Sequence, residues 1–99
     1  MIRAVRVLQR ALRDLEEIRS YVERDRPEAA GQLVGRLLDR MESLGRHPNA
    51  GVRPRDDRLR KLDYLFLVED SYLVFYKVDR RVVRIYRVLH GKRRYETVL

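Results

Sequence analysis

Apolar residues in the first half of the chain recur with the period of an α-helix. From Gln9 to about Glu23, and again between Pro27 and Gly45, they are spaced one, three or four positions apart, which places them on one face of a helix. Proline at 27 suits a first helical turn, and Gly45 with Pro48 ends the second segment. The pattern predicts two helices in an antiparallel hairpin. The two apolar stripes are Leu8, Ala11, Leu12, Leu15, Ile18 and Val22, then Ala30, Leu33, Val34, Leu37, Met41 and Leu44.

The pattern changes to that of β-strands in the second half. Residues 59–68, 72–78 and 82–89 are rich in β-branched and aromatic side chains, and short polar connections separate them. Three strands joined so tightly predict an antiparallel meander, with the helical hairpin covering one face. Ile2, Ala4 and Val7 indicate a further short strand at the start. We therefore expect an α+β fold over residues 1–99 as a single domain.

Composition narrows the classes of partner and chemistry. Twenty-three Lys and Arg residues against fifteen Asp and Glu give a net charge of +8, which favours anionic partners such as nucleic acid, an acidic protein or a membrane surface. The absence of cysteine excludes disulfides and a thiolate nucleophile. His47 and His90 lie too far apart in sequence for metal-ligand spacing, so we expect no metal and no cofactor. Without a signal peptide or a membrane-spanning segment, the expected location is the cytoplasm.

Basic residues concentrate in the last predicted strand and the tail. Seven of the fifteen residues from position 80 to 94 are basic and none is acidic. A period of two places Arg87 on the same face as Val83, Ile85 and Leu89, opposite Arg84, Tyr86, Val88 and His90. A guanidinium among apolar side chains requires a carboxylate, carbonyl groups or a ligand. The basic residues are Arg80, Arg81, Arg84, Arg87, Lys92, Arg93 and Arg94, and Arg58, Arg60 and Lys61 extend the same candidate surface for phosphate or target binding.

Three residues near the end of the chain are suited to proton transfer. RNA cleavage through the 2′-hydroxyl needs a base, an acid and cations for the phosphorane charge. His90 can act as either acid or base near neutral pH, whereas Lys92 or Tyr95 would need a lowered pKa to act as a base. The alternative is a structural histidine at the end of a strand, and the basic residues equally suit a solvated sheet edge.

Short motifs follow one another along the chain: Asp14-Leu15-x-x-Ile18-x-x-Tyr21, His47-Pro48-x-x-Gly51, Arg60-Lys61-Leu62, Tyr72-Leu73-Val74-Phe75-Tyr76-Lys77-Val78 and Ile85-Tyr86-Arg87-Val88-Leu89-His90-Gly91-x-Arg93. Their succession resembles the RelE/ParE toxin superfamily, most closely its ParE branch. The resemblance runs over nearly the whole chain in the family's order. Leu73 stands where RelE-like nucleases tend to carry an arginine, Arg93 matches their tail arginine, and Arg94 stands where ParE-like tails often have aspartate.

This resemblance implies a toxin of a type II toxin–antitoxin module, neutralised by an acidic antitoxin that wraps around it. ParE-like toxins poison DNA gyrase, which we take as the first hypothesis because of Leu73 and the Arg87-Val88-Leu89-His90 ending. RelE-like toxins cut mRNA in the ribosome, and this alternative would use His90, Arg93 and Tyr95 as catalytic residues. A third hypothesis is an inactive basic binding module.

Overall fold

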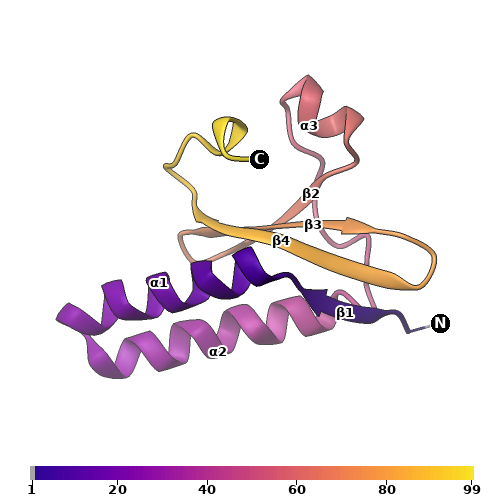
Figure 1. Cartoon of the computed structure of the whole chain (residues 1–99). Coiled ribbons are helices and arrows are strands. Elements are labelled where there is room, and N and C mark those ends of the chain that lie inside the picture. Colours follow the sequence, from indigo (N-terminus) through magenta and orange to yellow (C-terminus); the bar gives the residue numbers. More distant parts are fainter. Residues whose placement is uncertain (1) are drawn as a thin grey trace.

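The chain folds as a four-stranded sheet with a pair of helices on one face (Figure 1). The computed structural model describes residues 2–99. The sheet has the order β1-β4-β3-β2, in which β1 runs parallel to β4 and the other pairs are antiparallel. The α+β class, the opening strand and the helical hairpin are confirmed. The elements are β1 (Ala4–Val7), α1 (Gln9–Asp25), α2 (Pro27–Ser43), α3 (Asp57–Lys61), β2 (Leu65–Glu69), β3 (Tyr72–Val78), β4 (Val82–His90) and η1 (Tyr95–Thr97), a 3₁₀ turn.

The apolar stripes of α1 and α2 pack against the sheet, as their periodicity predicts. Pro27 occupies the first turn of α2. Leu12 was wrongly assigned to the buried stripe, because it is 46% exposed. Ala11 and Ile18 face the sheet, and Leu12 lies about 100° around the helix from Ala11. Within residues 2–99, neither helix is long and apolar enough to cross a membrane.

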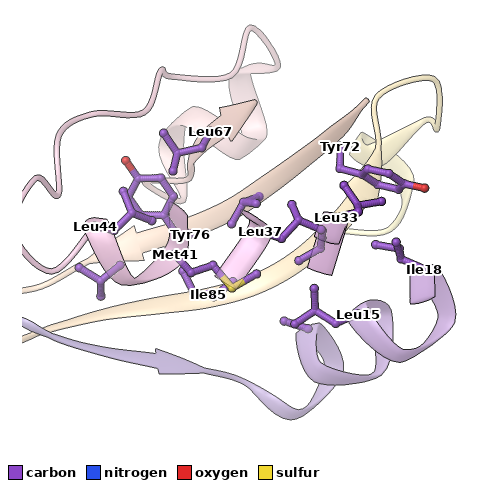
Figure 2. Close-up of a cluster of buried hydrophobic side chains, with 14 residues drawn as sticks. Leu15, Ile18, Leu33, Leu37, Met41, Leu44, Leu67, Tyr72, Tyr76 and Ile85 are labelled. Carbon is purple, nitrogen blue, oxygen red and sulfur yellow. The ribbon is translucent and has the colours of Figure 1, made fainter. Parts of the chain in front are cut away.

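The main core lies between the helical hairpin and the sheet. Figure 2 shows Leu37 and Met41 of α2 directed towards Tyr76 and Ile85 of the sheet. The Tyr76 hydroxyl donates to the Pro48 carbonyl at 2.8 Å and accepts from the Gly51 amide at 2.9 Å. A Cβ at position 51 would lie 2.5 Å from that hydroxyl oxygen, so only glycine allows this approach. Burial raises the pKa of Tyr76. Through its two hydrogen bonds, the Tyr76 hydroxyl holds the loop that follows α2 against the sheet.

A second, smaller core lies on the opposite face of the sheet. Residues 59–61 were expected to begin a strand, but they belong to α3, and β2 begins only at Leu65. The Asp56 carboxylate accepts a hydrogen bond from the Leu59 amide at 2.9 Å and caps the helix. Leu59 then lies fully buried beneath α3. Its buried neighbours are Tyr64, Phe75 and Leu89, and Phe66, Leu73, Tyr86, Tyr95, Val98 and Leu99 pack around them.

A β-bulge interrupts the pairing of β3 with β4. Tyr76 pairs with Ile85 and Phe75 pairs with Arg87, so Tyr86 is the additional residue. The strict alternation predicted along β4 is therefore wrong after Ile85. Val88 joins Ile85 in the main core, whereas Leu89 enters the second core. Because of the bulge, β4 contributes side chains to both cores. The alternation of faces along the strand therefore does not determine on which face Arg87 lies.

The turn between β3 and β4 is held by one carboxylate. Asp79 accepts hydrogen bonds from the amides of Arg81 and Val82, both at 2.9 Å, and pairs with the Arg84 guanidinium. The Arg81 amide bond, followed by the Arg84 bond, lowers the pKa of Asp79 from 3.8 to about 2. Arg84, a predicted target-binding residue, is thus an ion-pair partner within the turn.

This pKa predicts an acid-dependent contribution to stability. The lowered pKa means that folding stabilises the ionised form of Asp79. This contribution to stability is complete above pH 3.8 and is lost as the pH falls towards 2. We expect the urea midpoints of the wild type and of Asp79→Asn to converge over that interval. Asp39→Asn, at an exposed position on α2, is the control. A midpoint difference that does not change across the interval would contradict this prediction.

Candidate functional site

A buried ion pair connects α1 to the middle of β4. The pairing of β1 with β4 ends near Ile85, where the chain turns into α1 and leaves the next stretch of the β4 edge without a strand partner. Asp14 occupies this place: its Oδ2 accepts from the Val88 amide at 2.9 Å and from Arg87 Nε at 2.8 Å. Its Oδ1 accepts from Arg87 Nη2 at 3.1 Å and lies 3.1 Å from Arg10 Nη1. The carboxylate therefore accepts the Val88 amide hydrogen bond that a neighbouring strand would otherwise accept.

Arg87 has a carboxylate partner, Asp14. A carboxylate was one of the three kinds of partner that the sequence predicted for this arginine. Its side chain is 10% exposed and Asp14 is 3% exposed. The two-point contact with Asp14 occupies the guanidinium in the manner typical of arginine and carboxylate. Asp14 is buried together with the apolar residues of α1 that face the sheet. The sequence contains the signal, because Asp14 is three positions after Ala11 and four before Ile18.

A groove opens beside this ion pair, between the helical hairpin and the end of β4. Its volume is about 600 Å³, and its lining combines apolar side chains with charges of both signs. His90 and Arg93 lie on the sheet side, and Tyr21 and Ile18 lie on the helix side. Further lining residues are Asp14, Glu17, Val22, Arg26, Ala29, Leu33, Arg36, Asp70, Ser71, Tyr72, Val88 and Leu89.

His90 is exposed at the mouth of this groove. Its ring stacks edge-on against Tyr72, with centroids 5.4 Å apart. Its Nδ1 accepts a hydrogen bond from the Lys92 amide at 3.1 Å. Burial raises the pKa of Tyr72, and Asp70 raises it further, so the phenol beside His90 stays protonated at neutral pH. His90 is therefore held by the turn that follows β4, with Nε2 as its remaining polar atom.

Tyr95 lies on the other side of the sheet. Its ring packs against Phe75 with centroids 5.0 Å apart, within the second core. The structure thus brings His90 and Arg93 to one groove and leaves Tyr95 outside it. The expected catalytic set is divided between the two faces.

Five of the basic residues assigned to the candidate binding surface lie on α3 and in the tail. Arg60, Lys61, Lys92, Arg93 and Arg94 are exposed. Figure 1 shows α3 and η1 on the same side of the sheet, away from α1 and α2. The signal that placed Arg60 and Lys61 near the tail was their charge, and the expected strand for them was wrong. They reach this side because α3 packs on the second core through Leu59.

Comparison with known proteins assigns the chain to a family. The model of the ParE toxin of type II toxin–antitoxin systems, parDE, matches residues 5–95. The chain belongs to this family. It is therefore a toxin of a type II toxin–antitoxin system, as the motifs in α1, β3 and β4 indicate.

Relatives of this ParE-family toxin agree in sequence and fold. It is 34% identical to the putative toxin Y4kP of Sinorhizobium fredii, over 96% of this chain and 95% of that protein. It is 30% identical to toxin RelE3 of Caulobacter vibrioides, over 94% and 99% of the two chains. A chain of the chromosomal ParDE system from P. aeruginosa superimposes with a TM-score of 0.76 at 16% identity, covering 90% of this chain and 96% of that one. A chain of the RelBE2 toxin–antitoxin complex from Mycobacterium tuberculosis gives 0.69 at 20% identity, over 91% and 99%.

Proposed function

We propose that this toxin arrests growth by binding and poisoning DNA gyrase. The observation that carries the proposal is the separation of the groups a nuclease would need to combine. His90 and Arg93 line the groove, whereas Tyr95 packs on Phe75 across the sheet. A general acid and a general base must both reach the scissile phosphate. His90 and Tyr95 lie on opposite faces of the sheet, which does not favour such a pair. Assignment to the ParE family supports the same conclusion.

The basic tail is the part of the surface that we assign to the gyrase contact. Lys92, Arg93 and Arg94 follow β4 after Gly91 and are exposed. Clustered cations accelerate encounter with an acidic protein surface or with DNA held by an enzyme. Arg87 then has a supporting role, because it fixes the strand from which the tail emerges.

Purified gyrase provides the decisive test. We expect excess wild-type toxin to inhibit supercoiling and to trap the cleavage complex. Changing Lys92, Arg93 and Arg94 together to glutamine should weaken inhibition by at least about tenfold, because steering by a charged patch is worth that much. A variant with Arg13, Arg24 and Arg46 changed to glutamine has the same net charge and should inhibit like the wild type.

The outcome separates this proposal from mRNA cleavage. The relatives named RelE2 and RelE3, from Caulobacter vibrioides, are 36% and 30% identical to this chain. Primer extension on translating ribosomes would reveal A-site cleavage if this toxin shared a RelE-like activity. Cleavage there, with no effect on gyrase, would reject the gyrase proposal.

A cognate acidic antitoxin is the proposed partner. The groove supplies apolar side chains from both helices, with charges of both signs around them. Together with the net charge of +8, this suits an amphipathic acidic segment that folds on binding. The structural neighbours are described as toxin–antitoxin systems or complexes. Co-expression of a small acidic protein encoded next to the toxin should restore growth.

A further inference from the structure

Arg58 of α3 bonds to the end of the chain. Its Nη2 donates to the main-chain oxygen of Glu96 at 2.7 Å and to that of Leu99 at 2.8 Å. Arg58 was expected to belong to the target-binding surface. Two short charge-assisted hydrogen bonds instead direct its guanidinium to the tail. No side chain of the tail receives these bonds, so they depend on the path of the tail backbone.

Further contacts hold the same segment against the sheet. Tyr95 packs on Phe75, and Val98 and Leu99 pack around the second core. The amides of Val98 and Leu99 both donate to the Tyr95 carbonyl at 3.1 Å. The η1 turn is too short to be stable by itself. Its position therefore depends on Arg58 at one end and on the Tyr95 ring at the other.

We propose that Arg58 is a positioning residue that holds the tail so that Lys92, Arg93 and Arg94 meet the target in one fixed arrangement. This inference rests on the proposed gyrase function. The three basic residues lie between the end of β4 and η1, so both ends of the basic segment are anchored when Arg58 is bonded. Anchoring both ends reduces the conformational entropy that the segment loses on binding its target. Without Arg58, the far end of the segment is held only by the packing of Tyr95, Val98 and Leu99 on the second core.

The first test measures the tail directly in the full-length toxin. We expect Arg58→Gln to accelerate amide exchange at Thr97, Val98 and Leu99 by at least about tenfold, the size of a lost charge-assisted hydrogen bond. Exchange in β3 and β4, and the urea midpoint, should stay close to wild type. Arg58→Lys retains a charged donor and should restore part of the protection. Unchanged exchange in Arg58→Gln would overturn the proposal.

The second test asks whether Arg58 acts through the basic segment. Arg58→Gln should weaken gyrase inhibition by about tenfold, whereas the single-charge control Arg13→Gln should not. In a background with Lys92, Arg93 and Arg94 changed to glutamine, Arg58→Gln should cause no further loss, because a positioning residue acts only through the groups it positions. Additive losses would instead identify Arg58 as a direct contact, and equal losses for Arg13→Gln would indicate net charge alone; both would overturn the proposal.

The two proposals fail in different ways. If the wild-type toxin does not inhibit gyrase, the proposed function is rejected, and amide exchange still confirms or refutes the anchoring of the tail by Arg58. If the wild type inhibits gyrase and Arg58→Gln loosens the tail without weakening inhibition, the positioning role is rejected and the gyrase function remains.

Discussion

Replacing Asp14 with alanine is expected to lower the free energy of unfolding by about 3–5 kcal/mol, the cost of leaving a buried charge without its partner. The substitution removes both acceptors of the Arg87 guanidinium and the acceptor of the Val88 amide at once. Arg87 is too deeply buried for water to replace the carboxylate fully. Urea unfolding followed by circular dichroism measures this loss.

A surface carboxylate of the same helix provides the matched control. Glu16 pairs with Arg19 at 2.8 Å, and both side chains are exposed, so Glu16→Ala should cost less than about 1 kcal/mol. The double variant Asp14→Leu with Arg87→Met should be more stable than either single variant, since no buried charge remains. It should still be less stable than wild type, because the Val88 amide loses its acceptor. A cost for Asp14→Ala as small as that for Glu16→Ala would contradict the importance of the buried pair.

The features that local pattern predicted correctly are those that a short stretch of sequence determines. Period and end signals fixed the helical hairpin, including Pro27 at the start of α2. β-branched and aromatic content, with turn residues between the runs, predicted β3 and β4. The parallel pairing of β1 with β4 joins Ala4 to Val82, and no local signal records a contact between such distant segments. The ion pair between Asp14 and Arg87 is also a contact between distant segments, 73 positions apart. Each residue lies among apolar positions of its own element, but only the fold shows that the two side chains meet.

The errors have two local causes. Five residues of helix, 57–61, are too few for a periodic pattern, and their apolar and basic composition resembled a charged strand. A bulge is a single additional residue, and nothing in the run Ile85-Tyr86-Arg87 indicates where the pairing shifts. These two features place the second core under α3 and divide His90 from Tyr95. The candidate site was therefore predictable as a set of basic residues but not as an arrangement.

The second large effect is expected from Phe75→Ala, which should lower the free energy of unfolding by about 3–5 kcal/mol. Phe75 is fully buried, and its ring lies 5.0 Å from Tyr95, 5.5 Å from Phe66 and 6.5 Å from Tyr64 between centroids. Truncation to alanine leaves a cavity and removes these aromatic contacts. Urea unfolding gives the global cost, and Leu62→Ala, at a position 43% exposed, should cost less than about 0.5 kcal/mol.

The distribution of the loss caused by Phe75→Ala distinguishes the two cores. Phe75 belongs to the second core, and the tail rests on its ring through Tyr95. Amide exchange should therefore increase first at residues 95–99 and α3, with the helical hairpin opening only in global unfolding. Arg58 and Phe75 both hold residues 95–99. In the Phe75→Ala background, Arg58→Gln should therefore accelerate amide exchange of the tail further, provided that α3 stays folded. Equal acceleration of exchange in α1 and α2 would mean that the two cores unfold as one unit, and the tail could not then move independently of the fold.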